Sequence, residues 1–199
     1  YWGYLSCVPR DVDGDGDLDI IISDCLGKVR WIENTGTRQK PVLSKNVRNF
    51  YYGSQPLVTP WRNRPSVADW NGDGRLDFIV LDDQSDLVMY SQSAHNPEVL
   101  ENKRKLRKAD GSVFHIGRLT HPGGQGRFNM DVADWNGDGR LDLIRGEPRN
   151  YLGGGNMTIA INVGTNEDPV FEYDYMMARG GYFVEWTGSD GHDAWHCCM

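Results

Sequence analysis

The segment VADWNGDGRLD occurs twice without a change, at Val67–Asp77 and Val132–Asp142, and a looser copy, PRDVDGDGDLDIII, spans Pro9–Ile22. Counted from the first Asp of each copy, positions 1, 3, 5 and 9 carry a carboxylate or a carboxamide, and position 6 is always glycine. Acidic side chains on so short an arc repel one another unless a cation lies among them. The repeat therefore predicts three metal-binding loops.

Ca²⁺ is the expected ion, because it accepts six to eight oxygen ligands in a flexible geometry. About three Ca²⁺ per chain are expected, in a structural role, with position 7 contributing only its backbone carbonyl. The expected ligand residues are Asp11, Asp13, Asp15, Asp17 and Asp19 in the first loop, Asp69, Asn71, Asp73, Arg75 and Asp77 in the second, and Asp134, Asn136, Asp138, Arg140 and Asp142 in the third. The alternative is a metal-free surface turn, since Asp, Asn and Gly favour turns.

The loops differ from an EF-hand on their C-terminal side. An EF-hand needs a Glu at position 12 and flanking helices, whereas position 12 here holds Ile22, Val80 or Arg145. The residues around it read III, FIV and LIR, which are typical of strands. Each loop is therefore predicted to join two strands.

The charge of the chain is concentrated in these loops. They contain eleven Asp and two Arg, a charge of −9, against −7 for all 199 residues. Three Ca²⁺ would nearly neutralise the chain. An acidic chain without a known nucleic-acid motif is not expected to bind nucleic acid.

The loops mark a repeat of 58 and then 65 residues, starting at Asp11, Asp69 and Asp134. Each period predicts a strand into the loop, a strand out of it, a third strand and a variable fourth strand, at PVLSKNV, SVFHIGRL and PVFEYDYMMA. Four short antiparallel strands make one blade of a β-propeller. The expected repeats cover residues 5–62, 63–127 and 128–193, with the start of a fourth at 194–199.

DVDGDGDLDIII followed by GKVRWIENTG, together with the two VADWNGDGRLD segments, resembles the FG-GAP/VCBS repeats of secreted and surface propellers, including integrin α-subunit heads. The resemblance implies an all-β propeller with Ca²⁺ in its hairpin loops. Three blades do not close a ring of four to eight. The chain is therefore expected to be a fragment, completed by further blades of the same or another chain.

The remaining composition is typical of one all-β domain, and the resemblance implies an extracellular or cell-surface location. The chain has 24 glycines and 11% aromatic residues, begins with Tyr, and contains no stretch that would insert into a membrane. Four cysteines allow several pairings. Cys7 and Cys25 flank the first loop, so they are expected either to form a disulfide, which fits an oxidising compartment, or to be two buried free thiols.

The sequence also contains candidate residues for catalysis and for polysaccharide binding. His115, Arg118 and His121 are catalytic candidates, as a base and a carboxylate-binding group for a uronic acid, or else surface residues of a flexible hairpin. The basic run Lys103–Lys108 is either a solvated loop or an attractor for an anionic polysaccharide.

Aromatic side chains allow two interpretations. Trp70 and Trp135, at position 2 of their loops, are expected to pack against a neighbouring blade. Other aromatic residues are candidates for stacking on sugar rings; they are Trp31, Trp61, Tyr51, Tyr52, Tyr173, Tyr175 and Tyr182.

The sequence thus predicts a calcium-stabilised extracellular β-propeller that binds carbohydrate or a surface protein, in adhesion or recognition. Two alternatives remain open. One is the catalytic propeller of a polysaccharide lyase or another glycan-degrading enzyme. The other is a structural spacer in a large surface protein or filament.

Overall fold

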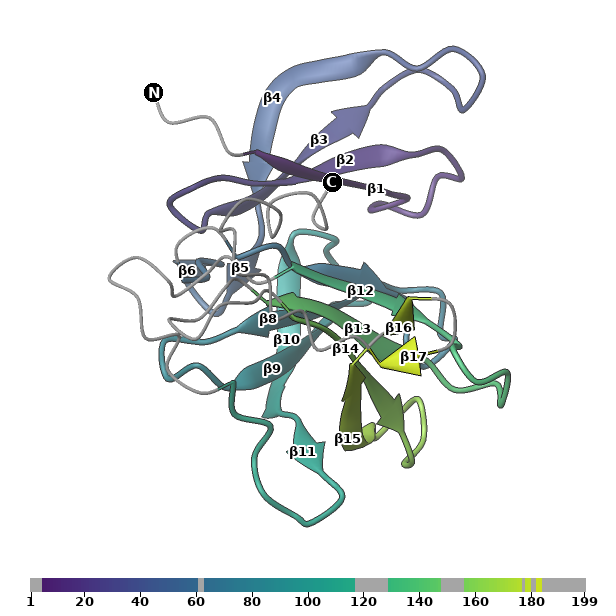
Figure 1. Cartoon of the computed structure of the whole chain (residues 1–199). Helices are drawn as coiled ribbons and strands as arrows, with labels where there is room; N and C mark the ends of the chain where they lie inside the picture. The colour runs from purple at the N-terminus through teal and green to yellow at the C-terminus, as the bar shows by residue number, and fades with distance from the viewer. Residues whose placement is uncertain are drawn as a thin grey trace, which may run out of the picture.

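The computed structural model describes residues 5–60, 63–116, 129–147, 156–176, 178–179 and 182–183. Every regular secondary-structure element in this part of the chain is a β-strand, which confirms the all-β prediction (Figure 1). Within these residues, no helix is long and apolar enough to cross a membrane.

The strands of the described residues form three larger sheets and one small one. The first sheet has the order β1-β2-β3-β4, the second β6-β5-β10-β9-β8-β7, the third β11-β15-β14-β13-β12, and β16 pairs only with β17. The strands of the first sheet are β1 (Ser6–Arg10), β2 (Asp19–Ser23), β3 (Val29–Asn34) and β4 (Leu43–Asn49). Those of the second are β5 (Tyr51–Tyr52), β6 (Gln55–Pro56), β7 (Ser66–Ala68), β8 (Asp77–Leu81), β9 (Leu87–Gln92) and β10 (Val99–Lys105). The others are β11 (Arg107–Lys108), β12 (Asn129–Ala133), β13 (Asp142–Glu147), β14 (Asn156–Asn162), β15 (Val170–Met176), β16 (Ala178–Arg179) and β17 (Tyr182–Phe183).

Each larger sheet contains one antiparallel unit of four consecutive strands: β1–β4, β7–β10 and β12–β15. The chain then adds a short strand to the outer edge of the next unit, where β5 pairs with β10 and β11 pairs with β15, both in parallel. These crossings link consecutive sheets through backbone hydrogen bonds.

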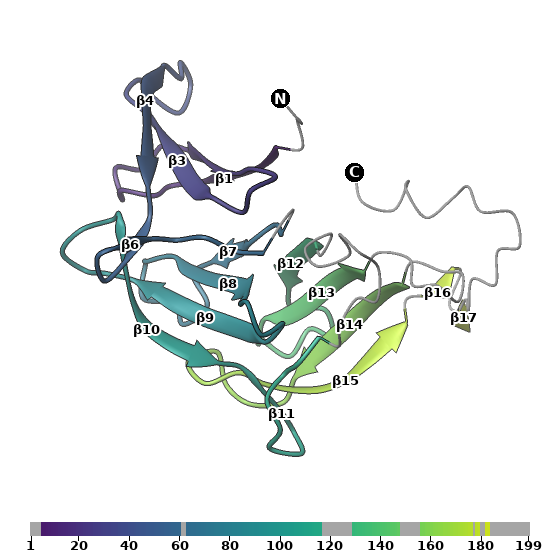
Figure 2. The same ribbon diagram turned by 90° about the vertical axis from the view of Figure 1, so that its left-hand side faces the viewer.

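The second sheet lies between the other two (Figure 2), and its strand β8, next to the edge strand β7, is buried on both faces. Along β8, Phe78 and Val80 belong to the hydrophobic cluster shared with the first sheet, whereas Ile79 and Leu81 belong to the cluster shared with the third. Successive side chains of a strand point to opposite faces. The unbroken apolar run FIVL is therefore the pattern of a strand with a sheet on each side.

The outer sheets bury one face of the equivalent strand. In β2, Ile21 is buried against the second sheet, while Ile20 and Ile22 on the opposite face are only half-buried. In β13, Leu143 is buried against the second sheet and Ile144 is half-buried. The half-buried apolar residues define two end faces, one on the first sheet (Ile20, Ile22) and one on the third (Ile144).

The fourth strand of the second unit is not where the sequence pattern predicts it. In SVFHIGRL, the described residues make only isolated bridges, at Val113 and His115, and β10 is the fourth strand instead. Most of the basic run expected to be a loop thus belongs to β10 and β11. Most side chains of β10 are exposed, so its charges remain in water while its backbone pairs with β9 and β5.

The predicted disulfide between Cys7 and Cys25 is wrong; the alternative of two free thiols is confirmed, but the burial expected for them is not found. Both are free thiols, with Cys7 exposed and Cys25 half-buried. The hairpin register pairs Cys7 with Ile22, so Cys25, in the turn after β2, lies beyond the residues that face β1. Cys197 and Cys198 lie outside the described residues.

Candidate functional site

The three repeated loops connect β1 to β2, β7 to β8 and β12 to β13, so each joins two antiparallel strands as predicted. The aspartate at position 1 fixes the turn by accepting backbone N–H groups. Asp11 accepts from Gly14 at 2.8 Å and from Gly16 at 3.0 Å, and Asp69 and Asp134 accept from the equivalent part of their loops.

Positions 3 and 5 extend this network in all three loops. Oδ1 of Asp15 accepts the backbone N–H of Asp17 at 2.9 Å, and Asp73 and Asp138 accept from position 7 at the same distance. The glycines at positions 4 and 6 all have positive φ, from 74° to 92°, a conformation that strains residues with a Cβ. The three loops therefore share one conformation, defined by hydrogen bonds within nine residues.

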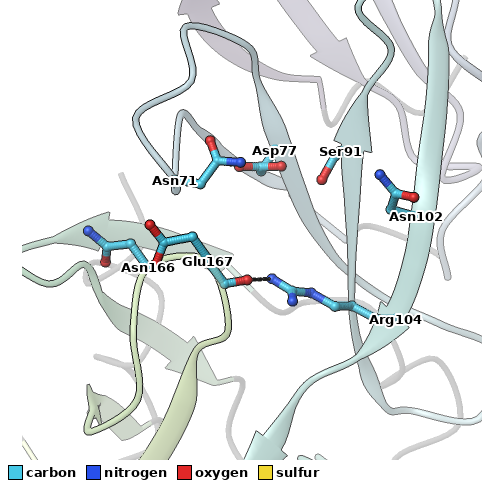
Figure 3. A pocket seen from close by; sticks show the side chains of 7 residues that line it. All are labelled: Asn71, Asp77, Ser91, Asn102, Arg104, Asn166 and Glu167. Carbon is cyan, nitrogen blue, oxygen red and sulfur yellow. Dashed lines mark hydrogen bonds between the residues drawn. The ribbon is translucent and has the colours of Figure 1, made fainter.

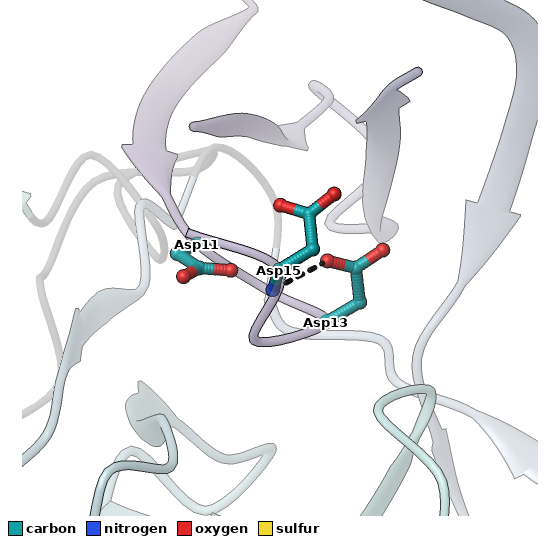
Figure 4. Close-up of side chains that lie close together, drawn as sticks. All are labelled: Asp11, Asp13 and Asp15. Atoms are coloured by element: carbon teal, nitrogen blue, oxygen red, sulfur yellow. Dashed lines mark hydrogen bonds between the residues drawn. The ribbon is translucent and has the colours of Figure 1, made fainter. Parts of the chain in front are cut away.

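The first loop gathers the most carboxylates. A carboxylate oxygen of each of Asp11, Asp13 and Asp15 lies within 4.8 Å of the others (Figure 4). Burial, followed by the charges of neighbouring aspartates, raises the pKa of Asp13. Oδ1 of Asp17 is buried and accepts no hydrogen bond from any described residue. The loop thus presents clustered, incompletely paired oxygens, a donor set that fits Ca²⁺.

The second and third loops balance part of their charge internally. The guanidinium of Arg75 lies 2.5 Å from Oδ2 of Asp73, and that of Arg140 lies 2.5 Å from Oδ2 of Asp138. The pKa of Asp138 is lowered, first by the backbone N–H of Arg140. Position 7 was expected to contribute only a carbonyl, but here its side chain contacts the carboxylate at position 5.

The aspartates at position 9 are buried and connect each loop to its sheet. Asp19 accepts the backbone N–H of Val12 at 2.9 Å and that of Asn34 at 2.7 Å. Asp142 accepts the equivalent pair, and Asp77 accepts from Trp70. Burial raises the pKa of both Asp19 and Asp77. Each carboxylate oxygen has two lone pairs, so these bonds leave room for a metal.

Of the weak catalytic candidates, only His115 lies in the described part of the chain; Arg118 and His121 lie outside it. Nδ1 of His115 is 2.8 Å from Oδ1 of Asp86, and Nζ of Lys105 is 2.6 Å from Oδ2 of the same carboxylate. Burial alone would raise the pKa of Asp86, but its hydrogen bonds and charge interactions with Lys105 and His115 lower it overall. Asp86 therefore orients the half-exposed imidazole, a contact that the sequence does not reveal.

The aromatic candidates divide by burial. Trp70 packs edge-on against Phe171 of the third sheet at 6.2 Å, which fits its predicted contact with a neighbouring unit. Trp135, at the same loop position, is half-exposed, so its predicted packing is wrong among the described residues. Trp31 is fully buried between the first and second sheets and cannot stack on a sugar, whereas Tyr52 is exposed.

The other stacking candidates, Trp61 and the side chains of Tyr173, Tyr175 and Tyr182, lie outside the described residues. Tyr51 is half-buried.

A polar pocket that the sequence does not predict lies beside the second loop, between the second and third sheets (Figure 3). Its lining residues are Asn71, Asp77, Ser91, Asn102, Arg104, Asn166 and Glu167. They come from two repeats and from four separate segments: the second loop, β9, β10 and the turn between β14 and β15. No local sequence pattern could have connected them.

Comparison with known proteins locates the repeat. Residues 11–80 match the model of the FG-GAP-like repeat, a span that begins at the first Asp of the first loop and ends in β8. No curated protein and no solved structure matches the chain significantly. The family match confirms the resemblance found in the loop motifs: the chain contains an FG-GAP-like repeat over residues 11–80.

Proposed function

We propose that this protein is a calcium-stabilised extracellular binding module of the β-propeller type, whose ligand is a carbohydrate or a surface protein. The observation that carries the proposal is the first loop, where the oxygens of Asp11, Asp13 and Asp15 gather within 4.8 Å beside the unpaired buried oxygen of Asp17. Such an arrangement is costly without a cation. Asp11, Asp13, Asp15, Asp17 and Asp19 would hold Ca²⁺ there, and the ion would neutralise their mutual repulsion.

The second and third loops would bind Ca²⁺ more weakly. Affinity of such loops rises with the number of charged ligands, and both loops carry Asn at position 3 and Arg at position 7. The arginine side chain is itself a counter-cation for the carboxylate at position 5. A calcium ion must therefore compete with it.

The propeller arrangement is supported by the way the sheets pack. The first strands of the second and third units, β7 and β12, lie close together, and each unit covers the same face of the next. The end face at Ile20 and Ile22 corresponds to the face of β8 that the first sheet covers. The end face at Ile144 corresponds to the face of β8 that the third sheet covers. Further blades, from the same or another chain, would cover both.

An extracellular location would suit loops of low calcium affinity, since extracellular calcium-binding modules have dissociation constants of about 10⁻⁴–10⁻³ M. Free Cys7 and Cys25 add no support for this location. The location therefore depends on the calcium loops alone.

The test of the proposal is thermal unfolding in Ca²⁺ and in EDTA, with the metal content measured on the same sample. A ligand that binds only the native state stabilises it by mass action. About three bound Ca²⁺ and a clear fall in melting temperature in EDTA are expected. Absence of bound calcium together with identical unfolding curves would refute the metal role.

A polysaccharide-degrading enzyme is the second candidate function, because Asp86 holds His115 through Nδ1 and leaves the other ring nitrogen available as a base. Incubation with a uronic-acid polysaccharide should then yield unsaturated products that His115→Gln abolishes. Lack of product from a stably folded, calcium-loaded protein would leave the binding function.

A further inference from the structure

We propose that the pocket between the second and third sheets binds one neutral, hydroxyl-rich ring, such as a terminal sugar residue. The inference rests on the proposed binding function and assigns it a site and a ligand class. Three of its lining residues belong to segments singled out in the sequence, Asn71 and Asp77 in the second loop and Arg104 in the basic run, but the sequence does not bring them together in one site.

The pocket has two opposite walls (Figure 3). One contains Asn71 and Asp77 of the second loop with Ser91 and Asn102 of β9 and β10. The other contains Asn166 and Glu167 from the turn between β14 and β15, and Arg104. Its volume of about 250 Å³ is below the range typical of drug-sized ligands, roughly 300–1,000 Å³. The size suits one ring of a larger glycan.

The lining groups match hydroxyl chemistry. Three carboxamides and one hydroxyl each both donate and accept hydrogen bonds, as a sugar hydroxyl does. Asp77 and Glu167 only accept, and Arg104 only donates. Both walls can therefore donate hydrogen bonds to adjacent hydroxyls of a sugar ring and accept hydrogen bonds from them.

The charges select against an anion. Two carboxylates and one guanidinium line the pocket, and the guanidinium already donates to the backbone carbonyl of Glu167 and lies 3.3 Å from the carboxylate of Asp168. Ca²⁺ in the second loop would neutralise Asp77, which leaves Glu167 of the lining and the nearby Asp168 to repel a ligand carboxylate, a form of selection by repulsion. A neutral sugar should therefore bind more tightly than the corresponding uronic acid.

The pocket is preorganised, with one group left free. Asn166 accepts the backbone N–H of Leu141 at 2.8 Å, and Arg104 also contacts the sulfur of Met89 at 3.1 Å. Asn102 has a φ of 54° within the irregular pairing between Glu101 and Arg104, and its amide has no hydrogen-bond partner among the described residues. Asparagine accepts positive φ more readily than most residues with a Cβ, and such conformations also cluster at ligand-binding sites. Bulges likewise redirect side chains next to binding sites.

The experiment is an NMR titration of the full chain in calcium buffer with the methyl glycosides of glucose, galactose and mannose, and with glucuronic acid as the anionic comparison. Asn102→Gly removes the amide and tolerates the positive φ. Ser85→Gly is the matched control, because Ser85 is the other described non-glycine residue with positive φ, 64°, and lies outside the pocket. Melting temperatures establish that both variants fold.

At least one neutral glycoside should bind saturably, with a dissociation constant in the millimolar range. Asn102→Gly should weaken that binding about fivefold, the loss expected for one hydrogen bond, and Ser85→Gly should leave it unchanged. Glu167→Gln should keep the neutral ligand and improve glucuronic acid binding.

No saturable neutral ligand, equal effects of Asn102→Gly and Ser85→Gly, or a preference for glucuronic acid in the native chain would each overturn the pocket proposal. This failure is distinguishable from failure of the proposed function. A calcium-stabilised chain that binds no glycoside rejects only the pocket, whereas Asn102-dependent binding by a chain without calcium supports the pocket and rejects the metal role.

Discussion

Replacing Asp13 by asparagine should have opposite effects on the metal-free and the calcium-bound protein. Asp13→Asn removes one negative charge from the first loop and installs the residue that occupies position 3 in the other two loops, Asn71 and Asn136. The side-chain carbonyl that accepts the N–H of Asp15 is kept. The substitution therefore changes charge while preserving the loop geometry.

The magnitude depends on the separation of the carboxylates. At 4.8 Å, two unit charges in water repel by about 0.9 kcal/mol, and physiological salt reduces this to roughly 0.5 kcal/mol. Asp13 has two neighbours within this distance, Asp11 and Asp15, and is also repelled by Asp19, so relief of repulsion should stabilise the protein in EDTA by at least about 1 kcal/mol. In calcium, a tenfold loss of affinity would lower the calcium-induced stabilisation by about 1.4 kcal/mol.

Urea unfolding monitored by tryptophan fluorescence, in EDTA and in saturating calcium, measures both quantities. Asp83→Asn, an exposed aspartate in the turn between β8 and β9, controls for the change in net charge. If Asp13→Asn destabilises the protein equally in both buffers, the carboxylate is only a structural acceptor and the metal argument is refuted.

The same variant gives a pH test in EDTA. Burial and neighbouring charges raise the pKa of Asp13 in the folded protein, so its neutral form is favoured by folding. The associated stability is fully present below the unfolded pKa and is lost as pH rises through the folded pKa. The advantage of Asp13→Asn should therefore grow with pH over this window and vanish below it. A pH-independent difference would contradict the raised pKa.

Two further predictions concern Arg75 in the second loop and Gly27, whose backbone lies close to that of Thr59. Arg75→Ala should raise the calcium affinity several-fold, because it removes the guanidinium 2.5 Å from Asp73, while costing at most about 1 kcal/mol as an exposed ion pair; calcium titration that shows equal or weaker binding would argue against competition. Gly27→Ala should cost at least twice as much as Gly53→Ala in urea unfolding. Both residues have positive φ, which alone costs roughly 1–2 kcal/mol, but a Cβ on Gly27 would also lie 1.8 Å from the carbonyl oxygen of Thr59, whereas the space around Gly53 is open. Equal losses would show that the backbone at residue 27 moves away freely.

The loops and their hairpins could be predicted from the sequence because their causes are local. The aspartate at position 1 accepts hydrogen bonds from backbone N–H groups three to five residues later. The glycines supply the positive φ that the turn requires. The apolar residues after each loop are strand formers, so the strand there was also predictable. The structure adds that the loops differ in charge balance, since the arginine at position 7 turns toward Asp73 or Asp138.

Burial and partner choice were decided only by tertiary structure. Trp70 and Trp135 occupy identical local sequences, yet one is fully buried and the other half-exposed. The difference arises because the third sheet covers Trp70, whereas no described residue covers Trp135. Likewise, the fourth strand of the second unit is β10 and not SVFHIGRL, because β10 is the segment that pairs with β9 and β5.

The sequence by itself determined the all-β class, the three acidic loops and the FG-GAP-like repeat, because each depends on contacts within a few residues. The tertiary structure decided the order of the sheets, the two end faces, the free thiols and the polar pocket. The pocket joins Asn71 to Glu167, which are 96 positions apart in the chain. Contacts at that separation depend on how whole sheets pack, and no local pattern of residues specifies them.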